Sequence, residues 1–118
     1  MNLRRGDVVL TRVPHAAGGR GKKRPAVVVQ ADVYNQSRRH AIVAEVTTNL
    51  ATATDPANLL IETATPDGQA TGLVQDSVFT CLQLATISQD RLSRVIGQLS
   101  PALLQKLDSC LKAALGLP

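Results

Sequence analysis

The chain has 118 residues, enough for a single domain (1–118) around one hydrophobic core, and its 44% hydrophobic and 19% charged residues are ordinary for a soluble fold. No apolar run approaches the ~20 residues of a membrane helix and the first residues lack a secretory apolar stretch, which excludes a membrane-spanning protein and predicts a cytoplasmic one. The net charge is +4, but residues 1–40 carry nine Lys or Arg against two Asp, a balance of +7 that favours nucleic acid or an acidic peptide as partner.

The first predicted elements are two strands joined by a basic loop. Residues 7–13 are rich in β-branched side chains and predict a strand that Pro14 ends, because proline has no N–H to donate. Three glycines then separate four cations, which predicts a flexible loop as far as Pro25. These cations are Arg20, Lys22, Lys23 and Arg24. A second strand is expected at residues 26–30, and its unbroken apolar run at 26–29 predicts a central strand with both faces covered.

Arg24 lies where the expected loop meets the expected strand. A guanidinium held by a rigid strand can donate to a phosphate in a bidentate manner, so Arg24 is a candidate phosphate ligand. The alternative interpretation is a solvated hairpin tip, because most runs of charge are simply hydrated.

The middle of the chain predicts further short strands. Residues 31–39 favour a turn or short helix, and residues 40–47 a third strand that leaves through Thr47, Thr48 and Asn49 into a polar loop reaching Asn58. A fourth strand is expected at 59–62, followed by a turn at 66–68. A long or bent strand then lies within 73–85, with a helical turn starting at Ser88 and a last strand at 94–99.

The C-terminal segment predicts an amphipathic helix. Ser100 is suited to the N-cap, Pro101 to the first helical position and Gly116 to the end of the helix. Six apolar residues fall on one face at three-to-four spacing and should pack on the sheet: Leu103, Leu104, Leu107, Leu111, Ala114 and Leu115. The expected fold is α+β or a small barrel, an antiparallel sheet of five or more strands closed by this helix.

Common catalytic and metal-binding patterns are not found. The two histidines, His15 and His40, form no zinc or hydrolase motif, and the glycine-rich loop has neither the spacing nor the following helix of a P-loop. Cys81 and Cys110 have no metal-ligand spacing and should be buried thiols, and most acidic residues should lie at the surface. We expect no cofactor and no metal site. Tyr34 and Phe79 are the only aromatic residues, too few for a base-stacking platform.

Four motifs in order resemble the MazF/PemK family of toxin endoribonucleases: R-R-G-D-V-V-L, G-K-K-R-P-A-V-V-V-Q-A-D, A-I-V-A-E-V-T-T-N and D-S-V-F-T-C-L-Q, before a closing helix. The resemblance spans nearly the whole chain. It implies a compact SH3-like barrel of the kind shared with CcdB, a homodimer, an acidic MazE-like antitoxin, and metal-independent, sequence-specific cleavage of single-stranded mRNA.

The resemblance also implies site residues. The family's catalytic arginine and threonine fall on Arg24 and Thr47, although Thr48 is adjacent and could take the second role. The expected RNA-binding residues are Arg20, Lys22, Lys23, Thr48, Asn49, Asp76, Ser77 and Gln83. One departure is that Gly19 and Arg20 occupy the part of the first loop where many relatives have a glutamate, which makes the loop more cationic.

Metal-independent cleavage needs an adjacent 2′-OH as the nucleophile, charge stabilisation on the phosphoryl oxygens and a proton for the leaving oxygen. Arg24 is suited to stabilising the negative charge on the phosphoryl oxygens, and Thr47 to orienting the 2′-OH or a phosphate oxygen. A group with the high pKa of arginine is a poor proton donor, so its electrostatic role is the better supported. Two rivals stay open: a same-fold toxin that binds a protein such as gyrase without nuclease activity, and a small DNA-binding regulator.

Overall fold

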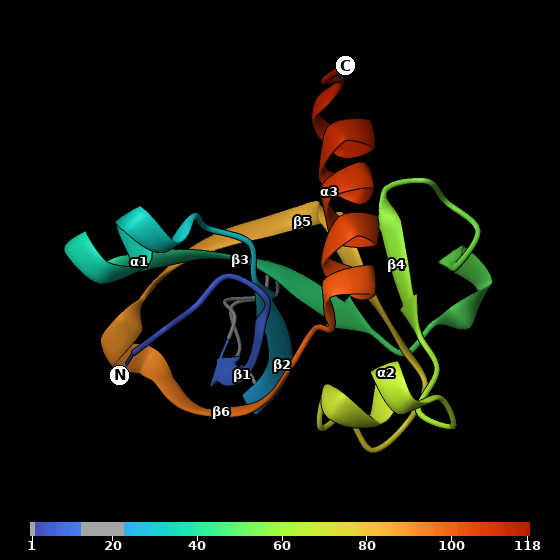
Figure 1. The fold of residues 1–118 in the computed structure, drawn as a ribbon, viewed down its shortest axis with the longest axis horizontal. Helices are drawn as coiled ribbons and strands as arrows, with labels where there is room; N and C mark the ends of the chain where they lie inside the picture. Colours follow the sequence, from blue (N-terminus) through green and yellow to red (C-terminus); the bar gives the residue numbers. More distant parts are fainter. Residues whose placement is uncertain (1, 13–22) are drawn as a thin grey trace.

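The computed structural model describes residues 2–12 and 23–118. Figure 1 shows a curled sheet with a long C-terminal helix standing beside it and shorter helices at its edges. The strands are β1 (Asp7–Arg12), β2 (Lys23–Val28), β3 (His40–Thr47), β4 (Asn58–Ile61), β5 (Ser77–Ser88) and β6 (Leu92–Gln98). The helices are α1 (Asp32–Ser37), η1 (Leu50–Thr52), α2 (Pro66–Ala70), η2 (Gln89–Arg91) and α3 (Pro101–Leu115). No helix in these ranges is long and apolar enough to cross a membrane.

All recorded strand pairs are antiparallel, in the order β4-β5-β3-β2-β1-β6. The antiparallel sheet of five or more strands with a C-terminal helix is therefore confirmed, as is the central place of β2. The sheet curls strongly (Figure 1), but its end strands β4 and β6 do not pair with each other within the described ranges, so the expected closed barrel is not confirmed.

The two faces of β2 enter two separate cores, as its apolar run predicts. Val27 of β2 and Val29, the residue directly after it, belong to the helix-side core, which also contains Leu107 of α3. Ala26 and Val28 belong to the inner core, on the opposite face of the sheet. Successive residues of a strand point to opposite faces, so an unbroken apolar run is what a strand covered on both sides requires.

Several boundaries differ from the sequence-based ones. β2 begins at Lys23, two residues before Pro25, because β1 extends far enough to pair Thr11 with Arg24 and Arg12 with Lys23. Pro25 is tolerated within the strand because the recorded pairing with β3 begins only at the next residue. The expected turn at 66–68 is the start of α2, which Thr65 caps by accepting from the N–H of Gly68.

The C-terminal helix follows the prediction closely. The Ser100 side chain accepts from the N–H of Leu103, and Gly116 ends the helix in the left-handed region at φ 68°. The expected apolar face is wrong at one residue: Leu115 is 57% exposed, because the last turn extends beyond the sheet.

The burial of individual residues tests the expectations for the cysteines and for Asp7. Cys81 and Cys110 are free, buried thiols, as predicted, and both lie in the helix-side core. Asp7, expected at the surface, is buried; its Oδ2 accepts from the N–H of Arg4 at 2.9 Å, and burial raises its pKa. Asp7 therefore fastens the segment before β1 to the strand.

Candidate active site

A wide bulge in β5 shapes the first cleft of the molecule. His40–Ala44 of β3 pair with Ser88–Leu84 of β5, but Glu45–Thr47 pair with Thr80–Val78. Residues 81–83 are therefore extra residues on β5, opposite the step from Ala44 to Glu45. Bulges re-aim side chains and bend the strand that contains them, and here Leu82 and Gln83 become exposed beside the end of β3.

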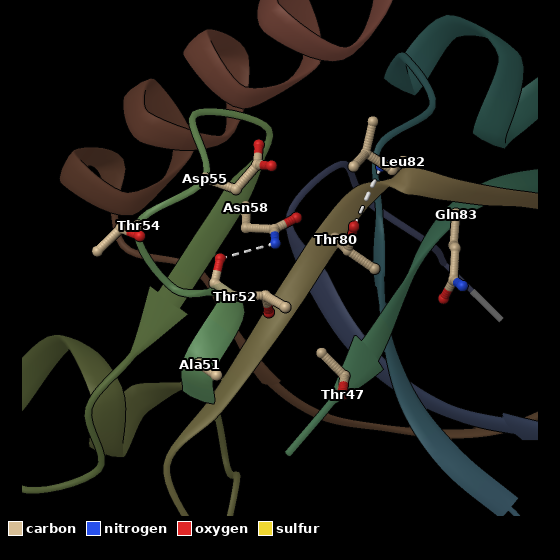
Figure 2. Close-up of a pocket in the computed structure, with 9 residues that line it drawn as sticks. All are labelled: Thr47, Ala51, Thr52, Thr54, Asp55, Asn58, Thr80, Leu82 and Gln83. Carbon is tan, nitrogen blue, oxygen red and sulfur yellow. Dashed lines mark hydrogen bonds between the residues drawn. The ribbon is translucent and has the colours of Figure 1, made fainter. Parts of the chain in front are cut away.

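The first cleft lies between this bulge, the end of β3 and the connection from η1 to β4 (Figure 2). Its volume is about 510 Å³, within the range of small-molecule sites. Its lining is mainly polar and neutral, with one carboxylate: Thr47, Ala51, Thr52, Thr54, Asp55, Asn58, Thr80, Leu82 and Gln83. The cleft therefore brings together two expected site residues, Thr47 and Gln83.

Thr47 is held at the last position of β3 by the turn that follows it. Its Oγ1 accepts from the N–H of Asn49 at 3.1 Å, and the Asn49 side chain accepts from the N–H of Ala51 at 3.2 Å, which caps η1. In this structure Asn49, expected to contact RNA, forms the turn that positions Thr47.

The recorded pairs between β2 and β3 end two residues short of Arg24. Ala26 pairs with Glu45 of β3, and Arg24 would lie against Thr47 if that register continued past Pro25. Residues opposite each other in an antiparallel pair share a face, so both side chains start from the face of the inner core. Thr47 pairs with Val78 of β5, and Arg24 pairs with Thr11 of β1.

The two residues nevertheless border different clefts. Arg24 borders a second cleft of about 600 Å³, together with Lys23, Thr48 and Ser77. The remaining lining is largely apolar: Leu10, Pro25, Val46, Gly72, Leu73, Val74, Gln75, Arg94, Val95 and Ile96. Among the described residues no hydrogen bond joins Arg24 to Thr47. The recorded β2–β3 pairs therefore stop short of Arg24, and the structure does not place Arg24 and Thr47 in one cavity.

The Asp76-Ser77 pair makes internal hydrogen bonds. Asp76 Oδ1 accepts from the N–H and the hydroxyl of Thr63, which lower the pKa of this exposed carboxyl. Ser77 is buried and donates to the carbonyl of Gln75 at 2.9 Å. The expected RNA contacts at Arg20 and Lys22, and the departure at Gly19, lie outside the described residues.

Sequence reasoning missed five polar residues of the first cleft: Thr52, Thr54, Asp55, Asn58 and Thr80. Asp55 carried a usable signal, since Asp before Pro is typical of a turn, and its Oδ1 accepts from the N–H of Ala57. Thr80 carried none, because a threonine in a strand is ordinary and only the bulge and the pairing with Asn58 turn it into the cleft.

Comparisons with known proteins agree on one family. Residues 4–115 match the family model described as PemK-like, MazF-like toxin of type II toxin-antitoxin system. The chain is similar to Endoribonuclease EndoA of Bacillus subtilis (strain 168), with 32% identity covering 99% of this chain and 97% of that protein. It is also similar to Endoribonuclease MazF6 of Mycobacterium tuberculosis (strain ATCC 25618 / H37Rv), with 31% identity covering 88% of each.

The fold has counterparts among solved structures. One is an endoribonuclease in complex with its cognate antitoxin from Mycobacterial species, with a TM-score of 0.77 and 22% identity, covering 98% of this chain and 97% of that one. At this identity the likeness establishes a shared fold.

Proposed function

The chain belongs to the PemK-like, MazF-like toxin family of type II toxin-antitoxin systems, and we propose that it is an endoribonuclease that cleaves single-stranded mRNA. In this proposal residues 1–118 act as one domain of the SH3-like PemK type, in the cytoplasm. The reaction is sequence-specific and needs no metal ion. It yields a 2′,3′-cyclic phosphate and a 5′-hydroxyl.

The single observation that carries the proposal is the register between β2 and β3. Ala26 lies opposite Glu45, and continuing this register by two residues sets Arg24 opposite Thr47 on one face, with Thr47 lining the polar first cleft and Arg24 bordering the second. Cβ atoms of directly opposite residues are roughly 4.5–5.5 Å apart, so if the register continues past Pro25 when RNA is bound, both side chains reach one phosphate.

Arg24 supplies the charge stabilisation in this mechanism. As a phosphodiester is attacked, negative charge grows on its non-bridging oxygens, and a guanidinium offers two parallel N–H donors to them. Arg24 is half-buried, and its strand is paired with β1 at this residue. A donor that is already oriented loses little conformational entropy when the transition state forms.

Thr47 supplies an orienting hydroxyl. Its Oγ1 already accepts from the N–H of Asn49, so its own hydrogen can be donated to a phosphate oxygen or to the 2′-oxygen. The 2′-oxygen is the nucleophile, so the substrate must contain ribose and a DNA strand should resist cleavage. Lys23, Thr48, Ser77 and Gln83, on the borders of the two clefts, contribute contacts to the rest of the strand.

The proposal includes two protein partners: a second copy of the chain and an acidic antitoxin. The second cleft supports the antitoxin, because Lys23, Arg24 and Arg94 surround apolar side chains such as Leu10 and Val74. A segment that alternates acidic and apolar residues complements such a surface. Competition between the antitoxin and RNA is expected, since both require Arg24.

The decisive experiment compares the protein with Arg24→Ala on a single-stranded RNA and its DNA counterpart, both in chelator. The unmodified protein should cleave RNA alone and leave cyclic-phosphate ends. Arg24→Ala should slow cleavage by on the order of 10²- to 10³-fold, with a smaller loss of binding. Arg39→Ala is the matched control, because it removes one positive charge at the opposite end of β3, on the order of 25 Å away.

Four results would contradict parts of the proposal. Equal cleavage by both proteins would remove Arg24 from the mechanism. Cleavage that stops in chelator and returns with a divalent ion would remove metal independence. Shifted DNA mobility without RNA cleavage would support a DNA-binding regulator, and binding to gyrase without cleavage would support the protein-directed toxin.

A further inference from the structure

The amide of Asn58 lies in the lining of the first cleft with one of its two polar atoms unsatisfied. Its Nδ2 donates to the carbonyl of Thr52 at 2.9 Å. A carbonyl only accepts, so the nitrogen must be the atom that faces Thr52, which fixes the oxygen on the other side. That oxygen, Oδ1, is buried and has no hydrogen-bond partner among the described residues.

Buried polar atoms in folded proteins are nearly always hydrogen-bonded, and an exception calls for a functional or structural explanation. Asn58 Oδ1 is the one such side-chain atom found within residues 2–12 and 23–118. Because it belongs to a residue that lines a cleft of about 510 Å³, the simplest occupant of the empty bond is a donor on a molecule that enters the cleft.

The other groups of the cleft indicate which donor this is. On the side of the η1–β4 connection, Asp55 adds a second acceptor, since only its Oδ1 is occupied, by the N–H of Ala57. Thr80, which pairs directly with Asn58, and Thr47 of β3 use their oxygens to accept from backbone N–H groups and keep their hydroxyl hydrogens for donation. Acceptors and hydroxyl donors therefore line the same cleft (Figure 2).

Resting on the proposed ribonuclease function, we propose that this cleft is a nucleobase subsite in which Asn58 accepts a hydrogen bond from an exocyclic amino group. Adenine, cytosine and guanine each carry such a group next to a ring or carbonyl acceptor that Thr47 or Thr80 can serve. Uracil has no amino group and offers only its ring N3–H as a base donor, so it cannot make the hydrogen bond that we assign to Asn58. Asn58 is thus a specificity-determining residue.

Entry of the base requires one local movement, because Oδ1 is buried while the cleft is empty. Leu82 is suited to it: the side chain lies on the β5 bulge, is 61% exposed and lines the same cleft. Exposed side chains change rotamer within nanoseconds, and an unpaired bulge residue is not fixed by a ladder partner. In this proposal a base that enters beside Leu82 shields the new hydrogen bond from water.

The test is a double-substitution cycle between Asn58 and the base. Binding is measured by fluorescence anisotropy with RNA carrying a 2′-deoxy group at the scissile position, and cleavage is measured with the all-ribose strand. At each recognised position, adenine is replaced by purine, guanine by hypoxanthine and cytosine by 2-pyrimidinone, which deletes only the amino group. For the unmodified protein one such deletion should weaken binding roughly 3- to 10-fold.

In Asn58→Ala and Asn58→Leu, the same deletion should have no effect, because the acceptor is gone. Gln69→Ala, which removes an exposed amide on α2, should keep the full penalty. Thermal melting of each variant shows that it is folded. If both Asn58 variants bind every RNA more weakly by the same factor, and deletion of the amino group still weakens their binding, Asn58 only holds the Thr52 turn. The proposal is then wrong.

The two proposals can fail separately. If the protein cleaves RNA but the loss on deleting an amino group does not depend on Asn58, the subsite proposal is wrong and the ribonuclease proposal still holds. Binding with the Asn58-dependent penalty but without cleavage overturns the ribonuclease and supports the subsite. An absence of RNA binding overturns both.

Discussion

Thr63 and Asp76, thirteen residues apart, are joined by two hydrogen bonds: the N–H and the hydroxyl of Thr63 both donate to Asp76 Oδ1, at 2.8 and 2.9 Å. They connect the end of β4 to the start of β5 across the segment that contains α2. Because Ser77 begins β5 and borders the second cleft, this clamp holds one wall of that cleft in place.

Asp76→Ala should therefore destabilise the protein in a pH-dependent manner. The hydrogen bonds from Thr63 lower the pKa of Asp76 from 3.8, so its stabilisation is present above that pH and is lost as the pH falls through the lower value in the folded state. Urea unfolding at about pH 7 should show a deficit in the free energy of unfolding that shrinks towards about pH 3.

Glu62→Ala is the control for this clamp. Glu62 is an exposed carboxylate beside Thr63 whose side chain makes no hydrogen bond within the described part of the chain. Its replacement should leave stability nearly unchanged at both pH values. A deficit for Asp76→Ala that is the same at both pH values would show that the carboxylate charge is not what stabilises the clamp.

Replacements of Thr47 should separate catalysis from local structure. Thr47→Ser keeps the oxygen that accepts from Asn49 and keeps a hydroxyl hydrogen, so RNA cleavage should stay within about tenfold. Thr47→Val removes both and should slow cleavage by on the order of 10²-fold. Single-turnover cleavage of one defined RNA measures both effects.

Thr48→Val tests the register. Thr48 borders the second cleft, on the other side of β3 from Thr47, so this change should weaken RNA binding more than it slows the cleavage step. A larger loss of rate for Thr48→Val than for Thr47→Val would transfer the orienting hydroxyl to Thr48.

The apolar face of α3 can be tested by two leucines. Leu107 is completely buried in the helix-side core, so Leu107→Ala should lower the free energy of unfolding by about 3 kcal/mol, through lost transfer energy and a cavity. Leu115 is 57% exposed, and Leu115→Ala should change the free energy of unfolding by less than about 0.5 kcal/mol. Chemical denaturation gives both values; similar losses would mean that the last turn packs on the sheet.

The thiol of Cys81 should be unreactive in the folded protein. Burial, with a smaller contribution from Cys110, raises its pKa to about 12, so almost no thiolate forms at neutral pH. Iodoacetamide should label neither cysteine of the native protein but both after unfolding, as counted by mass spectrometry. The variant Leu82→Cys places a thiol on the exposed neighbouring residue and should add one rapidly labelled site. Rapid labelling of Cys81 in the native protein would contradict its burial.

The sheet could be predicted from sequence because its signals are local. The run Ala26–Val29 has apolar residues for both faces, and it forms the central strand β2 between two cores. Ser100, Pro101 and Gly116 mark the ends of α3 by their own backbone and capping chemistry. The four ordered motifs indicated the family for the same reason: each is a contiguous stretch.

The sequence by itself determined the strands, the final helix, the family and the two candidate catalytic residues. Only the tertiary structure decided what surrounds them, because a cleft depends on pairings between distant segments. The bulge at 81–83 exists only in the register of β3 with β5, and it brings Thr80 and Gln83 towards Asn58 of another strand. Whether an amide such as Asn58 is satisfied depends on every neighbouring atom, so its unpaired oxygen could be found only in three dimensions.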